Sequence, residues 1–215
     1  WVTEAKRQVF GTVGIDFLAG PSEVLIIADD TADPDFVAAD LLAQSEHDPN
    51  ARGILISLSE DLASKVLVSL EKLLSDLGTA DIAKKSWEDN GQVFVADTME
   101  EALELANEIA PEHLEICIKN PEEVINSLHN YGSLFIGNYA AEVFGDYVSG
   151  TNHILPTMKA ARYTGGVWVG TFLKVVSFQK ITKEGARELI PAASNLAETE
   201  GLYAHELAAD IRLED

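Results

Sequence analysis

The run Val24-Leu25-Ile26-Ile27-Ala28 is continuously apolar and has the length of one β-strand. A strand without alternating polar residues is typical of a parallel sheet that helices cover on both faces. Comparable apolar runs recur at residues 52–58, 92–96, 114–118 and 133–137. The sequence therefore predicts five buried strands.

Segments with helical spacing of apolar residues separate these runs. The first helix is expected to open at Asp33-Pro34, with Asp33 as N-cap, and to end near His47, before Asp48-Pro49-Asn50. Further helices are predicted over residues 60–77, 81–88, 98–110 and 121–128. Strands that alternate with helices predict an α/β fold: a parallel sheet with helices on both faces, here an incomplete Rossmann-like domain.

The pattern changes after about residue 154. Residues 156–170 are rich in Gly and Thr and predict irregular structure, whereas residues 183–200 and 203–211 predict two helices. We therefore expect a small C-terminal helical appendage.

Composition narrows the functional class. The 215-residue chain has a formal net charge of −21, which argues against a nucleic-acid partner because phosphates are repelled by an acidic surface. No apolar run reaches the roughly 20 residues that span a bilayer, so no membrane association is expected. The single cysteine, Cys117, lies in an apolar run and is expected to be a buried core thiol. The lack of disulfides fits the cytoplasm.

Four side chains suit a mixed nitrogen and oxygen metal site. Gln44 and His47 are three residues apart and share a helix face, but such residues are equally typical of a solvated helix end. Asp146 follows the fifth predicted strand, where open α/β sheets bind ligands beyond the carboxyl ends of their strands. His205 lies at the start of the last predicted helix. Together the four residue types suit zinc, although their spacing alone does not establish a site.

Glu112 and His113 are adjacent and lie directly before a predicted strand. A carboxyl group beside an imidazole is what proton transfer near neutral pH requires, although a turn with two exposed polar residues gives the same pattern. Gly150-Thr151-Asn152-His153 is a polar turn that either lines a pocket or is an ordinary loop. No G-x-G-x-x-G or P-loop motif is present, so the nucleotide-binding fingerprint is missing.

Several blocks, in this order, resemble the histidinol dehydrogenase family, and the resemblance covers nearly the whole chain. The blocks are Val2-Thr3-Glu4-Ala5-Lys6-Arg7-Gln8-Val9, Ala19-Gly20-Pro21-Ser22-Glu23-Val24, Asp40-Leu41-Leu42-Ala43-Gln44-Ser45-Glu46-His47, Ala110-Pro111-Glu112-His113-Leu114-Glu115 and Gly150-Thr151-Asn152-His153-Ile154-Leu155-Pro156-Thr157. The resemblance implies oxidation of L-histidinol to L-histidine through an aldehyde, the last step of histidine biosynthesis, with two NAD and with zinc that holds the substrate.

The resemblance also implies roles for residues that occupy matching positions. The zinc-ligand positions are Gln44, His47, Asp146 and His205, and these residues would also contact the substrate. His113 takes the place of the base that removes the hydroxyl proton and touches the substrate, and Glu112 that of the residue that activates water. Ser22, His153 and Glu200 match other substrate contacts. The family's Glu200 and His205 positions reach into the neighbouring subunit, which implies a homodimer.

The chain is expected to be the family's C-terminal half, with most NAD contacts in an absent N-terminal half, so that the isolated chain would be inactive or bind only zinc. Residues 1–22 would then end the NAD-binding lobe, residues 23–155 form the main domain with the zinc and catalytic residues, and residues 156–215 connect to a helical dimerisation segment. Residues 160–170 resemble a branch that acts on other primary alcohols, such as sulfonate-bearing diols. Two alternatives therefore stay open: such a paralogue, and a non-catalytic zinc-stabilised dimerisation module.

Overall fold

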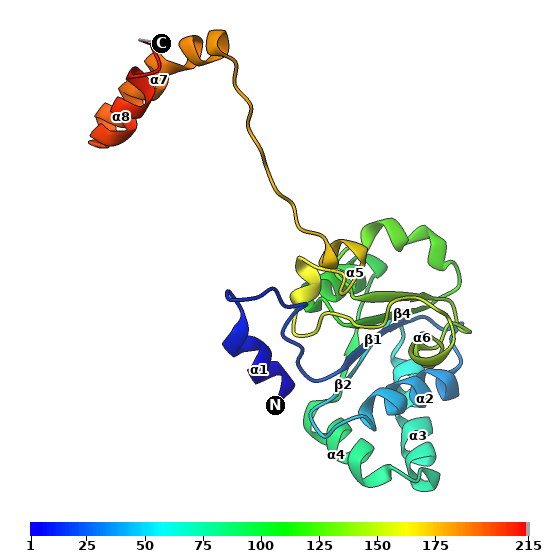
Figure 1. Ribbon diagram of the computed structural model, residues 1–215. Coiled ribbons are helices and arrows are strands. Elements are labelled where there is room, and N and C mark those ends of the chain that lie inside the picture. The colour runs from blue at the N-terminus through cyan, green and yellow to red at the C-terminus, as the bar shows by residue number, and fades with distance from the viewer. Residues whose placement is uncertain (214–215) are drawn as a thin grey trace. The chain divides into compact units, whose positions relative to one another are not determined.

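The computed structural model describes residues 1–213 and divides the chain into two compact units, Trp1–Phe172 and Leu173–Asp215. The first unit is built on five parallel strands in the order β3-β2-β1-β4-β5 (Figure 1). The strands are β1 Glu23–Ala28, β2 Arg52–Ser57, β3 Gln92–Val95, β4 His113–Cys117 and β5 Ser133–Ile136. The predicted α/β class, the parallel sheet and all five strands are confirmed.

Helices cover both faces of the sheet, as the continuous apolar strands predict. On one face, Val24, Ile26 and Leu55 pack against α2, α3 and α4, and on the other, Leu25 and Ile54 pack against α5. The helices of the first unit are α1 Val2–Val9, α2 Pro34–Ser45, α3 Glu60–Asp76, α4 Ala80–Asn90, α5 Met99–Ile109 and α6 Glu142–Tyr147. The covered faces are the reason that the strands carry so few polar residues.

The predicted helix starts are visible as side-chain caps. Asp33 accepts a hydrogen bond from the backbone N–H of Asp35 at the start of α2. Thr98 accepts from the N–H of Glu101 at 3.2 Å, and the Glu101 carboxylate accepts from the N–H of Asp97 at 3.0 Å. The capping residues therefore set where these helices begin.

Two predictions need correction. Residues 121–128 do not form one helix but two short 3₁₀ turns, Pro121–Glu123 and Ile125–Ser127, because the middle of the segment, Val124-Ile125-Asn126-Ser127, consists of residues with low helix propensity. No helix was predicted directly after the fifth strand, but Asp146 lies within α6.

The second unit consists of α7 Lys183–Glu200 and α8 Tyr203–Asp210, with Gly201 in a left-handed conformation between them. Both predicted C-terminal helices are thus present. Residues 156–170 are irregular, as predicted, apart from 3₁₀ turns at Ala160–Arg162 and Val169–Phe172. No helix among residues 1–213 has the length and apolarity needed to cross a bilayer.

Candidate functional site

Histidines and carboxylates from four segments converge over β4, on the face of the sheet that α2 covers. His113 is the first residue of β4, Asp146 lies on α6, His153 follows α6, and His47 comes two residues after α2. His113 Nε2 lies 3.0 Å from His153 Nε2, and His153 Nε2 lies 2.9 Å from Asp146 Oδ1. Asp146 Oδ2 lies 4.0 Å from His47 Nε2. Residues that are more than 100 positions apart in sequence thus form one continuous polar cluster.

The backbone of Glu23 fixes the two residues that sequence reasoning singled out for proton transfer. Its N–H donates to Glu112 Oε2 at 2.9 Å, and its carbonyl oxygen lies 2.8 Å from His113 Nδ1. The carbonyl can only accept, so His113 Nδ1 carries the proton and Nε2 presents its lone pair to the cluster. The parallel pairing of β1 and β4, with Val24 level with His113, creates this arrangement.

Burial shifts both groups in directions that suit proton transfer. Burial lowers the pKa of His113 to about 4, so the imidazole is neutral near pH 7 and able to accept a proton. Burial raises the pKa of Glu112 to about 8, and the negative charges of Glu23 and Asp146 add to this effect. Opposite shifts on adjacent groups are typical of acid and base pairs in active sites.

Gln44 is fully buried, and neither atom of its side-chain amide has a hydrogen-bond partner among the described residues. A buried amide without partners costs about 1–3 kcal/mol, so a native protein retains one where a ligand or ion completes it. Gln44 stands one helical turn before His47, and His47 Nε2 approaches Asp146 Oδ2. An amide oxygen, an imidazole nitrogen and a carboxylate oxygen make a donor set that fits zinc.

Three further carboxyl groups that the sequence analysis did not select interact with one another beside this cluster: Glu115 and Glu142 are buried, and Asp40 is half-buried. Glu115 on β4 is 1% exposed and accepts a hydrogen bond from the N–H of Glu142 at 2.9 Å. Burial raises the pKa of Glu142 to about 8 and that of Asp40 on α2 to about 6, and burial with the charge of Asp40 raises the pKa of Glu115. Glu115 had a sequence signal, a charge within an apolar strand, whereas Glu142 and Asp40 had none.

The position of Asp146 differs from the expected one. Asp146 was predicted beyond the carboxyl ends of the strands, but its carboxylate lies beside His153, which contacts His113 at the amino end of β4, where Glu112 and His113 were predicted. The reason is α6, which packs against α2 and starts with Glu142 hydrogen-bonded to Glu115 in the middle of β4. Asp146 and His153 are thereby placed at His113.

Ser22, Glu200 and His205 were also predicted to belong to the site. Ser22 is half-buried directly before β1, where its carbonyl accepts the N–H of Arg52. Glu200 ends α7 and His205 lies in α8, and both are exposed within the second unit. The described contacts of the cluster within the first unit join His47, Glu112, His113, Asp146 and His153.

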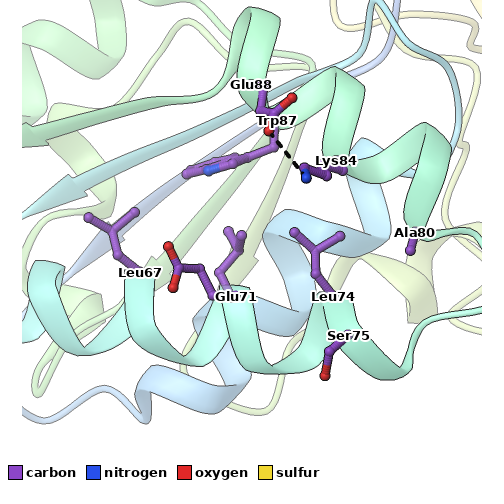
Figure 2. A pocket seen from close by; sticks show the side chains of 9 residues that line it. Leu67, Glu71, Leu74, Ser75, Ala80, Lys84, Trp87 and Glu88 are labelled. Carbon is purple, nitrogen blue, oxygen red and sulfur yellow. Dashed lines mark ion pairs between the residues drawn. The ribbon is translucent and has the colours of Figure 1, made fainter.

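A groove of about 670 Å³ lies between α3 and α4, with Leu67, Leu74 and Trp87 among its lining residues (Figure 2). The polar residues that line it make contacts typical of a protein surface, such as the ion pair between Lys84 and Glu88. The groove contains none of the histidines and none of the buried carboxyl groups, so the chemistry of the molecule is concentrated over β4.

Comparisons with known proteins point to one family. The family described as histidinol dehydrogenase matches residues 1–213. The chain is 47% identical over 213 residues to a histidinol dehydrogenase homolog of Shouchella clausii, covering 99% of this chain and 50% of that protein. It is 48% identical over 213 residues to the histidinol dehydrogenase of Brucella suis, with 99% and 50% covered.

A solved structure gives the same result for the fold. The crystal structure of histidinol dehydrogenase from Elizabethkingia anophelis matches with a TM-score of 0.87 and 43% identity, over 100% of this chain and 49% of that one. The chain thus spans about half the length of the relatives that it matches.

Proposed function

Because the chain belongs to the histidinol dehydrogenase family, an oxidoreductase family, we propose that it forms the zinc-binding and proton-transfer half of an enzyme that oxidises L-histidinol to L-histidine. The overall reaction takes the alcohol to the aldehyde and then, after addition of water, to the carboxylate. Each oxidation transfers a hydride to one NAD. The observation that carries the proposal is the pairing of a neutral His113 imidazole with the Glu112 carboxyl group. A second observation supports it: the buried amide of Gln44 has no hydrogen-bond partner among the described residues.

The metal would be held by Gln44, His47 and Asp146, with His205 as the fourth ligand. When bound there, zinc would supply a Lewis acid for holding the substrate. The unpartnered amide of Gln44 supports this assignment. NAD is proposed to bind mainly to the half of the full-length protein that lies outside this chain, since the chain has no nucleotide fingerprint.

The protein groups divide the proton transfers between them. His113 Nε2, whose lone pair is left free by the Nδ1–H bond to Glu23, would accept the hydroxyl proton as hydride leaves the carbinol carbon. Glu112, as a carboxylate, would take a proton from the water that adds to the aldehyde. His153, with Ser22 and Glu200, would contact the substrate, and the homodimer would bring Glu200 and His205 to the partner's site.

The electrostatics favour a cationic substrate over the sulfonate-bearing diols of the alternative branch. The described hydrogen bonds and ion pairs of Glu112, Glu142 and Asp146 run to histidines, backbone groups and other acids. An ammonium group bound here would favour the ionised form of these carboxyl groups, whereas a sulfonate would find no Lys or Arg among these contacts to pair with. This charge balance is the reason for preferring an amino alcohol.

Steady-state oxidation by the full-length protein tests the proposal. With zinc and NAD present, L-histidinol should produce two NADH per molecule consumed, and a sulfonate-bearing diol should produce none at the same concentration. NADH production from the diol but not from L-histidinol would show that the protein is a paralogue that acts on other alcohols. Zinc binding and dimers with no turnover of either alcohol would instead support the dimerisation module.

A further inference from the structure

Glu142, which no prediction selected, is the carboxyl group that joins the two halves of the site. Its Oε1 lies 3.7 Å from Nε2 of His113 in the proton-transfer half. Its carboxylate also groups with His47 and Asp146 in the metal half, with the three ligand atoms within 4.8 Å of one another. Among the described residues, Glu142 is the member common to both of these groups of histidine and carboxyl side chains.

A hydrogen bond to the sheet fixes the backbone of Glu142. Glu142 is the first residue of α6 and is 2% exposed, and its N–H donates to Glu115 Oε1 at 2.9 Å. Glu115 is itself 1% exposed on β4, in the same strand as His113. The side chain therefore projects from a point that is fixed to the sheet, and its carboxylate lies within 4.8 Å of that of Asp146, one helical turn further along α6.

Such a placement costs stability. A carboxyl group that is almost fully buried beside two further acids, Glu115 and Asp146, has to be desolvated against neighbours of its own charge. An apolar side chain of the same size would pack there without that cost. A buried carboxyl group that destabilises the fold is therefore better explained by a role in the function of the site than by a role in folding.

We propose that Glu142 is a positioning residue that fixes the spacing between the metal ligands His47 and Asp146 and the base His113. The inference rests on the function proposed above. A substrate held by the metal reacts only if its hydroxyl group falls within hydrogen-bond reach of His113 Nε2, and an error of about 1 Å in such spacing can cost about 100-fold in rate. Glu142 contacts both sides of that gap.

Two substitutions of nearly equal size separate positioning from packing. Glu142→Gln keeps a group that can donate to Asp146, whereas Glu142→Met fills the same space without any hydrogen bond. If Glu142 positions the site, Met should lower kcat and zinc affinity about 10–100-fold each, and Gln should recover most of both. If Glu142 only fills space, Met should match the wild type. Glu88→Met, an exposed glutamate on α4, is the matched control and should change neither quantity.

Zinc affinity is measured on the 215-residue chain by competition with a chromophoric chelator, and kcat and KM on the full-length protein with zinc and NAD. The KM for NAD should stay constant in both variants, since Glu142 belongs to the metal and proton-transfer groups. Wild-type zinc affinity and kcat in Glu142→Met would overturn the positioning role and leave the proposed function intact. Absence of both zinc binding and turnover in the wild type would instead sink the proposed function and this inference with it.

Discussion

At the scale of single residues, the site depends on one peptide unit. The N–H and the carbonyl oxygen of Glu23 hold Glu112 and His113 at 2.9 and 2.8 Å, so the strand pairing itself aims both side chains. A backbone group cannot be removed by substitution and does not change rotamer. The tautomer of His113 is therefore set by the fold, and the base is ready before substrate arrives.

The raised pKa of Glu112 predicts a pH dependence for the second oxidation. Glu112 is neutral below about pH 8, and only the carboxylate can activate water, so aldehyde oxidation should accelerate as pH rises towards 8. In the full-length protein, Glu112→Gln should slow this half-reaction about 10²–10⁴-fold and remove its pH dependence, with a smaller effect on alcohol oxidation. Stopped-flow measurement of NADH from each substrate checks this, and equal slowing of both half-reactions would count against the assignment.

Loss of one proposed ligand should be visible without any turnover. His47→Ala should weaken zinc binding by the chain more than about 100-fold, because the incomplete ligand set cannot hold the ion. The matched control is His129→Ala, which removes an exposed histidine outside the cluster. Elemental analysis after dialysis against a weak chelator would show the difference. Full zinc retention in His47→Ala would remove His47 from the ligand set.

The sequence could supply candidates at this scale but not their contacts. Glu112, His113, Asp146 and His153 were selected, and the structure brings them together. The full burial of the Gln44 amide could not be read from the sequence, because a glutamine near a helix end is usually solvated. Glu142 was missed because its importance comes from how α6 crosses β4, a tertiary fact without a local signal.

At the scale of elements, local rules predicted most of the fold. Apolar runs predicted the strands, and N-capping residues predicted where the helices begin. Both signals depend on only a few neighbouring residues, so they can be recognised in the sequence. The rules failed at residues 121–128, where Pro121 opens a segment that forms only 3₁₀ turns. They also placed Asp146 beyond the carboxyl ends of the strands, because the general rule for open sheets does not anticipate a helix such as α6, which brings Asp146 to His153 and His113.

The N-cap of α5 allows a test of whether capping residues determine where a helix begins. Thr98→Ala removes the acceptor for the Glu101 N–H and should lower the free energy of unfolding by about 1 kcal/mol. Thr12→Ala, at an exposed threonine outside any helix, should lie within about 0.5 kcal/mol of the wild type. Urea denaturation of the chain provides both values. A Thr98→Ala variant as stable as the control would show that packing alone defines the start of α5.

At the scale of the whole molecule, the buried acids make stability depend on pH. Folded Glu112 and Glu142 keep their protons up to about pH 8, whereas in the unfolded chain they lose them near 4.5. The folded state then binds more protons, so stability falls as pH rises between these values. His113 acts in the opposite sense, but only between about 4 and 6.5.

Between pH 6.5 and 8 the carboxyl groups alone should dominate. The free energy of unfolding of the metal-free chain should fall over this range, by up to about 2 kcal/mol for each of the two glutamates. Thermal unfolding in the presence of a chelator measures the change, and Glu142→Gln should reduce the slope because it removes one titrating group. A transition temperature that is constant or rises from pH 6.5 to 8 would contradict the assigned burial of these acids.

We propose that this chain carries a metal-dependent site for a cationic amino alcohol. Calorimetric titration of L-histidinol into the zinc-loaded chain, with the zinc-stripped chain as control, tests this proposal without any need for NAD. We expect binding that requires zinc and that is lost in His47→Ala. A chain that retains zinc and binds a sulfonate-bearing diol but not L-histidinol would show that the proposed substrate class is wrong.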